Sequence, residues 1–368
     1  MPSLEGKVRY GVVGAGWISQ CAFMPGVPQT TNSILTALVS GTPEKNERLG
    51  IDYGLETYTY DEYDKLLNSG LIDAVYIGLP NDQHRQFAVR ALEAGIHVLL
   101  EKPVATSLED AKAIEAAAKA SGVKLMIAYR LHCEPGTISA VEAIRRGEIG
   151  KPRFFTSTFS QRVKASNYRA QSGYWGGPVA DMGNYPINAV RNLFEAEPIE
   201  VAAIGSRTER ELGCEDTVSV VMKFTEGRQA SFTVCYSADG VDMFNVVGTD
   251  GTLKMEPAFG FSPDLAITYE ISKKDGETET RKAPITDQFA GETDYFSDCI
   301  LNDREPEPNG EEGVLDMRVL AAIEKALETG EVQKLDPVSR QRRMDKSLRR
   351  ELTYGKQPDM VAGEPPVE

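Results

Sequence analysis

A lysine, an aspartate and a tyrosine stand out as candidate acid–base groups. Lys102 lies in Glu101-Lys102-Pro103, directly after a short apolar run that predicts a strand. Asp181 and Tyr185, with Asn188 beyond them, are spaced to share one face if a helix begins there. A tyrosine hydroxyl beside a lysine ammonium suits proton transfer. The three residues are therefore candidate catalytic groups, although a solvated loop lysine and a buried phenol remain the alternatives.

A glycine-rich turn follows the first predicted strand, which covers residues 8–13. Gly14 and Gly16 occupy the first two glycine positions of G-x-G-x-x-G, and Ser19 stands at the third. Trp17 and Ile18 then open a predicted helix, whose first amides and positive dipole end can hold a pyrophosphate. The turn predicts a dinucleotide site, with a simple loop as the alternative.

The end of the second predicted strand bears on which dinucleotide binds. An NAD site usually has Asp or Glu at this place to hold the ribose 2′-hydroxyl. Here Ser40 and Gly41 end the strand, and Lys45 and Arg48 follow in the next helix. These groups can hold a 2′-phosphate. The chemistry favours NADP over NAD, and Glu44 is the one feature against it.

Strands and helices alternate through the first third of the chain. This order predicts βαβ units and a parallel sheet. The predicted strands are 8–13, 33–39, 74–78, 97–100 and 124–128, and the predicted helices are 43–53, 82–94 and 107–121.

Consecutive strands with short turns dominate after residue 150, which predicts a mostly antiparallel sheet. The strands are expected at 151–160, 200–206, 217–224, 229–235, 243–247 and 265–271, and two helices at 291–302 and 310–329. We expect an NADP-binding domain over 1–130, an α+β substrate and oligomerisation domain over 131–330, and a C-terminal extension over 331–368 that is ordered only if it docks.

The composition limits the possible partners. The 368 residues include 40 Lys and Arg against 55 Asp and Glu, for a net charge of -15, so nucleic acid is not an expected partner. The basic stretch 340–350 is interpreted as a solvated helix face. No apolar run is long enough for a membrane span, and no secretory signal is evident. Scattered cysteines and 3 histidines predict no metal site, and we expect a cytoplasmic protein.

The glycine turn, Glu101-Lys102-Pro103 and the Asp181–Tyr185 segment together resemble the Gfo/Idh/MocA oxidoreductases, the family of glucose–fructose oxidoreductase and related sugar dehydrogenases. Further segments that carry the resemblance are Leu79-Pro-Asn-Asp-Gln-His84, Leu125-Met-Ile-Ala-Tyr-Arg130 and Glu311-Glu-Gly313. It extends from Val8 to near Thr329. Tyr185 is similar to the tyrosine of the aldose-oxidising members, whereas many other members have histidine there.

The resemblance implies an α/β Rossmann domain followed by an α+β domain with a large, mostly antiparallel open sheet, through which a homodimer or homotetramer forms. It implies Lys102, Asp181 and Tyr185 at the reaction centre. Further cofactor-binding residues that it implies are Leu79, Pro80, Asn81, His84, Glu101, Arg130 and Trp175.

The activity that the resemblance implies is NADP-dependent oxidation of the C1 hydroxyl of a pyranose aldose to a lactone. Coupling to ketose reduction in a ping-pong cycle is one extension of this activity. NADPH-dependent reduction of a keto- or anhydro-sugar and a non-catalytic NADP-binding regulator are the alternatives.

Overall fold

The computed structural model describes residues 6–367, which divide into two compact units. The first unit contains residues 6–134, 286–314 and 350–365. The second contains 135–285, 315–349 and 366–367. Each unit is therefore built from segments that are distant in the sequence.

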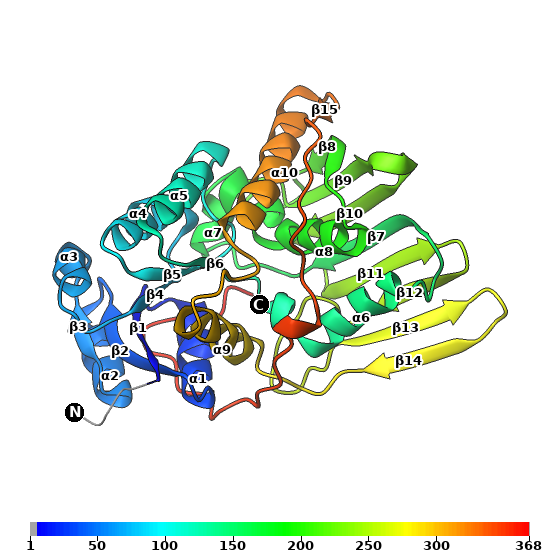
Figure 1. Cartoon of the computed structure of the whole chain (residues 1–368). Coiled ribbons are helices and arrows are strands. Elements are labelled where there is room, and N and C mark those ends of the chain that lie inside the picture. The colour runs from blue at the N-terminus through cyan, green and yellow to red at the C-terminus, as the bar shows by residue number, and fades with distance from the viewer. Residues whose placement is uncertain (1–5, 368) are drawn as a thin grey trace. The chain divides into compact units, whose positions relative to one another are not determined.

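A six-stranded parallel sheet forms the centre of the first unit (Figure 1). Its strand order, β3-β2-β1-β4-β5-β6, is that of a dinucleotide-binding Rossmann fold. The strands are β1 (Val8–Val13), β2 (Ser33–Val39), β3 (Glu56–Tyr58), β4 (Ala74–Ile77), β5 (His97–Leu100) and β6 (Leu125–Ile127). All six run the same way, so their carboxyl ends lie at one edge.

The helices of this unit begin and end at recognisable signals. Pro43 is the first residue of α2, and Gly54 ends it in a left-handed conformation. Ser107 caps α5 by accepting a hydrogen bond from the Asp110 amide. The helical elements are η1 (Ser19–Phe23), α1 (Met24–Gly26), η2 (Val27–Gln29), α2 (Pro43–Tyr53), η3 (Tyr60–Glu62), α3 (Tyr63–Leu67), η4 (Asn81–Gln83), α4 (His84–Glu93), α5 (Leu108–Ser121) and η5 (Arg130–Cys133).

Later parts of the chain complete this unit. Helix α9 (Gln288–Leu301) packs beside β1 and β2, where the hydroxyl of Ser297 lies 2.8 Å from that of Tyr10 and 2.7 Å from that of Ser33. The Ile127 amide of β6 donates to the carbonyl of Pro308. The Rossmann sheet is thus covered and extended by residues far from it in the sequence.

A nine-stranded sheet forms the second unit, in the order β14-β13-β12-β11-β7-β10-β9-β8-β15. Every neighbouring pair is antiparallel except β7 and β10. The strands are β7 (Pro152–Ser160), β8 (Pro198–Ser206), β9 (Thr217–Phe224), β10 (Gln229–Cys235), β11 (Val241–Gly248), β12 (Gly251–Met255), β13 (Thr268–Lys273), β14 (Thr278–Lys282) and β15 (Gln333–Lys334). The expected α+β domain with a mostly antiparallel sheet is confirmed.

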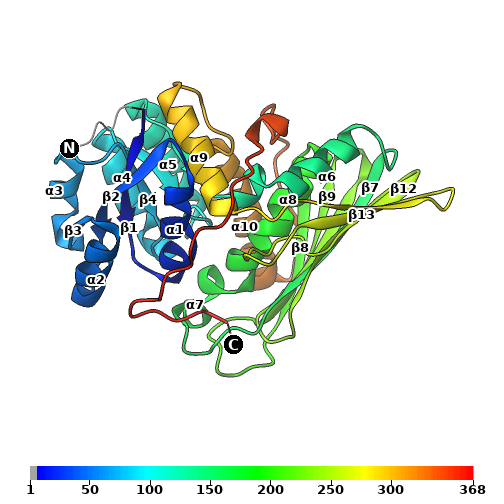
Figure 2. The same ribbon diagram turned by 90° about the horizontal axis from the view of Figure 1, so that it is seen from below.

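Helices α6 (Pro135–Arg145) and α8 (Asn184–Phe194) lie on one face of this sheet (Figure 2). Strand β9 alternates buried and exposed residues, so the opposite face is open. That open face carries exposed Phe154, Ile204 and Val221. The remaining helical elements are α7 (Tyr168–Gln171), η6 (Tyr174–Gly176), η7 (Val179–Gly183), η8 (Thr225–Gly227), η9 (Lys346–Leu348) and α10 (Gly310–Thr329), which belongs to this unit from Leu315 onward.

Several predicted elements shift, and the basic stretch needs a correction. Helix α9 begins at Gln288 rather than residue 291, because Asp287 accepts hydrogen bonds from the Phe289 and Ala290 amides. The predicted strand 265–271 is instead β13 (Thr268–Lys273). Residues 340–350 are not a solvated helix face: they are largely irregular, and Arg340, Met344 and Leu348 are buried.

Two absences hold for residues 6–367. None of their helices has the length and apolar character needed to cross a membrane. Nor do these residues contain a group of three or more His, Cys, Asp or Glu side chains that could hold a metal ion.

Candidate active site

The glycine turn after β1 passes very close to the segment after β4. Gly14 has φ +95°, and a Cβ there would lie 2.8 Å from Leu79 Cδ2 and 2.9 Å from the Gly78 carbonyl oxygen. Only glycine is compatible with this conformation and this space. A Cβ on Gly16, by contrast, would have its nearest neighbour at 3.9 Å, again the Gly78 oxygen. Gly16 therefore leaves open space beside the turn, as a close-approaching pyrophosphate requires.

Two side chains of the helical run that follows the glycine turn, those of Ser19 and Gln20, hydrogen-bond to the backbone of the turn. The Ser19 hydroxyl donates to the Gly14 carbonyl at 2.6 Å, so the residue at the third glycine position has a structural contact of its own. The side-chain amide of Gln20 donates to the backbone carbonyls of Ala15 and Val361. Trp17 and Ile18, which are half-buried, begin the helical run. These hydrogen bonds hold the backbone of the glycine turn. The first backbone amides of the helical run come directly after it in the sequence.

The end of β2 has the environment expected for a 2′-phosphate. Ser40 is buried, and Gly41 contacts the Tyr60 ring so closely that a Cβ would lie 3.0 Å from it. Lys45 lies half-buried in the first turn of α2, and burial lowers its pKa. Arg48, one turn on, is exposed. A partly desolvated ammonium at this edge gains most from an anionic partner.

His84 ties the ends of β4 and β5 together. Its ring is fully buried, with Nδ1 3.0 Å from the Pro103 carbonyl and Nε2 2.9 Å from the Leu79 carbonyl. Pro80 and Asn81 follow Leu79 in the same loop and are half-buried. Any effect of His84 on a nucleotide is therefore exerted through the two loops that it joins.

Glu101 and Lys102 follow β5 and differ in environment. The Tyr76 hydroxyl donates to Glu101 at 2.7 Å, and the Tyr76 ring stacks on Phe23 at 3.8 Å. Burial raises the pKa of Glu101, although the neighbouring Lys102 and Arg130 charges oppose that rise. Lys102 itself is half-buried. Glu101 is thus anchored within the unit, while Lys102 is partly exposed at the strand end.

Two ionisable side chains near Glu101, those of Arg130 and Glu292, are buried. Arg130 is 4% exposed and donates to Gln288 of α9. Glu292, also on α9, is fully buried, and neither of its carboxylate oxygens has a hydrogen-bond partner among residues 6–367. Burial, and then the negative charge of Glu101, raise the pKa of Glu292 well above its ordinary value.

In the second unit, Asp181 and Tyr185 stand on successive helical turns. Asp181 lies in the π-helical segment η7, and Tyr185 is the second residue of α8. The Tyr236 hydroxyl, fully buried at the end of β10, lies 3.0 Å from Asp181 Oδ2 and 3.0 Å from the Gly176 carbonyl oxygen. Burial raises the pKa of Tyr236 well above its ordinary value, so its hydroxyl keeps its proton and donates.

Aromatic and basic side chains surround this pair. The Tyr185 ring contacts Phe159 and Phe259, with centroids 5.7 Å away in both cases. Arg169 Nε lies 4.0 Å from Asp181 Oδ1. Trp175 is hydrogen-bonded to Glu324 of α10. A carboxylate, a phenol and flat aromatic surfaces are the groups that commonly bind a sugar, through its hydroxyls and its C–H faces.

The structure thus places the candidate residues in two groups. The glycine turn, Ser40 to Arg48, Leu79 to His84, Glu101, Lys102 and Arg130 belong to the first unit, around the carboxyl ends of its strands. Asp181, Tyr185 and Trp175 belong to the second. The sequence analysis does not identify Tyr236 and Glu292, because the residues that flank each of them do not indicate that it is buried.

The first unit has a dinucleotide-binding fold, and the second has a nine-stranded, mostly antiparallel sheet with helices on one face. Two family models match the chain: "Oxidoreductase family, NAD-binding Rossmann fold" over residues 8–129, and "GFO/IDH/MocA C-terminal domain" over residues 137–254. The chain belongs to this GFO/IDH/MocA oxidoreductase family, as its sequence motifs predict.

The similarity to named relatives covers most of the chain. It is 30% identical to the D-xylose 1-dehydrogenase (NADP(+)) of Haloarcula marismortui, over 90% of this chain and 94% of the relative. The solved aldose-aldose oxidoreductase from Caulobacter crescentus is 32% identical, with a TM-score of 0.83 over 89% of this chain and 100% of that one. A 3-ketoreductase from Actinomadura kijaniata, solved with NADP and TDP-benzene, is 26% identical, with a TM-score of 0.80 over 87% and 98%.

Proposed function

We propose that this protein is an NADP-dependent sugar oxidoreductase that oxidises the C1 hydroxyl of a pyranose aldose to a lactone. The observation that carries the proposal is the pair Asp181 and Tyr185 on successive helical turns, with Asp181 held by Tyr236. The relatives named for D-xylose 1-dehydrogenase and aldose-aldose oxidoreductase activity support the substrate class.

The residues of the first unit fit NADP. Gly16 leaves space that a Cβ would fill, and the Gly14 turn has the positive φ of a phosphate-binding loop. Ser40 and Gly41, rather than a carboxylate, stand at the end of β2, and Lys45 and Arg48 follow in α2 together with the exposed Glu44. The solved 3-ketoreductase that holds NADP supports the same assignment.

The proposed mechanism divides the work among three side chains. Bound NADP supplies a hydride acceptor. Tyr185 takes the proton of the C1 hydroxyl as the C–H bond breaks, and Lys102 binds that hydroxyl. Asp181 accepts hydrogen bonds from sugar hydroxyls and fixes the orientation of the ring. In the alternative assignment, Lys102 accepts the proton and Tyr185 is its partner.

The experiment that tests this proposal is the Lys102→Met variant, assayed with a panel of aldoses that includes D-xylose. We expect kcat to fall by roughly 10²–10⁴, because a positioned acid–base group contributes about that much. Nucleotide affinity, measured by calorimetry, should change far less. Lys112→Met, an exposed lysine of α5, is the matched control. Near-normal turnover by Lys102→Met would contradict the role.

A sugar-reductase function is the second candidate, supported by the similarity to the 3-ketoreductase. Comparing kcat/KM in both directions on aldoses and on keto- and anhydro-sugars separates the two. Turnover of aldose and ketose pairs without added nucleotide would indicate the ping-pong cycle. Nucleotide binding with no turnover of any sugar would instead indicate a regulator.

A further inference from the structure

The helix that carries Tyr185 is anchored by a buried polar network on its far turns. Tyr185, Asn188 and Asn192 follow one another at intervals of three and four residues, so they lie along one stripe of α8. Arg191, next to this stripe, is fully buried. The position of the Tyr185 hydroxyl therefore depends on how these later residues are held.

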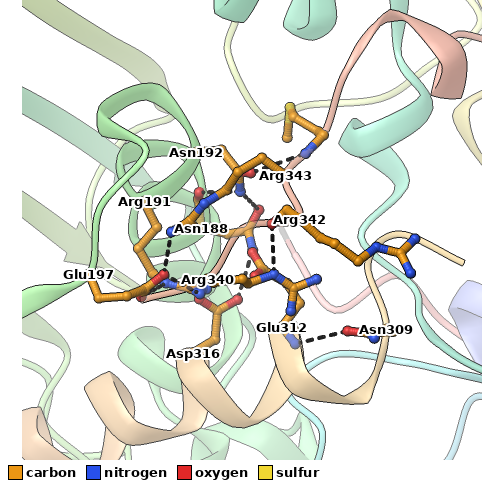
Figure 3. Close-up of polar contacts among 11 residues, drawn as sticks. Asn188, Arg191, Asn192, Glu197, Asn309, Glu312, Asp316, Arg340, Arg342 and Arg343 are labelled. Carbon is orange, nitrogen blue, oxygen red and sulfur yellow. Dashed lines mark hydrogen bonds and ion pairs between the residues drawn. The ribbon is translucent and has the colours of Figure 1, made fainter. Parts of the chain in front are cut away.

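Two acidic residues hold Arg191 and Asn188. Arg191 donates to Glu197 through Nε at 2.5 Å and through Nη2 at 3.1 Å, and its Nη1 donates to Asp316 of α10. The Asn188 side-chain amide donates to the other Asp316 oxygen at 2.9 Å. Figure 3 shows these side chains converging on one another. Both acids are buried, with side-chain exposures of 3% and 1%.

The C-terminal segment 340–344 completes the network. Arg343 Nη2 donates to Glu197 Oε1 at 2.7 Å, so Glu197 is shared by two arginines (Figure 3). The next residue, Met344, is 2% exposed, and its amide lies 3.4 Å from Asn192 Oδ1. The Met344 carbonyl accepts from Arg145 of α6 at 2.7 Å. The segment thus contacts α8 directly through its backbone, at Asn192, and indirectly through the Arg343 side chain, which shares Glu197 with Arg191.

We propose that segment 340–344 is a positioning element of the active site, in which Arg343 and Met344 fix the rotation of α8 and thereby the place of Tyr185. Buried ion pairs add little net stability, and in some proteins their role is to specify one conformation. A displaced reacting group, in turn, loses rate steeply. This inference rests on the proposed function, because it assigns Arg343 an effect through Tyr185.

Arg343 is the informative residue to change. Removing Arg191 would leave both Glu197 and Asp316 buried without their main counter-charge, so that variant would lose its fold. Removing Arg343 leaves Glu197 paired with Arg191. The protein should therefore fold, with α8 held less firmly.

The test compares Arg343→Met and Arg343→Lys with Lys346→Met, an exposed lysine of η9 two residues beyond the segment. The readouts are the single-turnover rate of hydride transfer per nucleotide-loaded site and the amide hydrogen exchange of α8. We expect Arg343→Met to lower that rate about tenfold or more and to speed α8 exchange about tenfold, with nucleotide affinity unchanged. Arg343→Lys should recover part of both effects, and Lys346→Met should match the wild type.

Three outcomes would overturn the inference. Unchanged exchange in Arg343→Met would show that the segment does not anchor α8. Faster exchange, or a lower Tm, with an unchanged rate per loaded site would show a structural role only. A wild-type protein that transfers no hydride with any sugar would refute the proposed function itself, and the exchange data would still report whether Arg343 anchors the helix.

Discussion

We propose that the Tyr236 hydroxyl contributes to sugar binding through Asp181, so Tyr236→Phe should weaken sugar binding. Removing one hydrogen bond to a charged group costs about 1.5–3 kcal/mol, so we expect KM for the aldose to rise about tenfold or more. Binding of the nucleotide should not change. Tyr269→Phe is the matched control, because its buried hydroxyl lies 2.7 Å from that of Ser139. Equal KM values in wild type and Tyr236→Phe would argue against a role for Asp181 in sugar binding.

Lys45 should make NADP affinity depend on pH and salt. Its ammonium must be charged to attract the 2′-phosphate, and burial lowers its pKa. Affinity for NADP should therefore fall as pH rises from neutral toward that pKa, and also as salt rises.

NAD lacks the 2′-phosphate, so its affinity should change less with pH and salt. Lys45→Met should lower NADP affinity about tenfold and remove most of the pH dependence, as loss of one charge-assisted contact predicts. Calorimetric titrations with both nucleotides measure each effect. Identical pH profiles for NADP and NAD would indicate that Lys45 does not contact the phosphate.

At the residue scale, the sequence identifies the candidate catalytic residues but not the buried residues that support them. Lys102, Asp181 and Tyr185 stand in recognisable motifs. Tyr236 and Glu292 do not, because each becomes significant only when a distant segment packs against it. A tyrosine at the end of a strand and a glutamate in an amphipathic helix are ordinarily surface residues.

At the scale of elements, the two glycines of the β1–helix turn should behave differently. Gly14→Ala forces a Cβ into a left-handed conformation and against Leu79 and Gly78, so it should destabilise the protein by about 1–3 kcal/mol. Gly16→Ala has room within the protein, so Tm should stay near the wild-type value while nucleotide affinity falls. Thermal unfolding and calorimetry on both variants check this. A Gly16→Ala protein with full nucleotide affinity would show that the pyrophosphate does not approach there.

Element prediction succeeds where the hydrophobic pattern is strong. The sequence predicts β1, β2, β5, β9, β10 and α10 with the ends that the structure shows. It misses β14 (Thr278–Lys282), which has no apolar residue and pairs only at a sheet edge. It also misses α6, which starts at Pro135 directly after a short helical turn. For β14, pairing with β13 rather than local pattern determines the structure.

At the scale of the whole molecule, the open face of the nine-stranded sheet is the expected oligomer contact. Ile204 is 79% exposed and Val221 is 49% exposed on this face. We expect a homodimer or homotetramer, and the double variant Ile204→Asp, Val221→Asp should dissociate it, because charges are costly to bury. Sedimentation measures the mass. Ile51→Asp, at a 76% exposed position on α2, is the control. A monomeric wild type would contradict this proposal.

The alternation of elements predicts a Rossmann unit followed by a sheet unit, and the structure confirms that fold class. It does not predict that residues 286–314 and 350–365 return to the first unit. Such returns depend on contacts such as Tyr10 with Ser297, and these join positions too distant for any local pattern to indicate.

The return of residues 350–365 sets an order of events during synthesis. On the ribosome, the glycine turn emerges early, whereas Val361, which exchanges two hydrogen bonds with Gln20 beside that turn, emerges only after residues 135–285 and 315–349 of the second unit. The glycine turn must therefore stay without these two hydrogen bonds while the rest is translated. Chaperone demand should be greatest in this interval, and a premature stop codon late in the gene would harm the part of the protein that was made first.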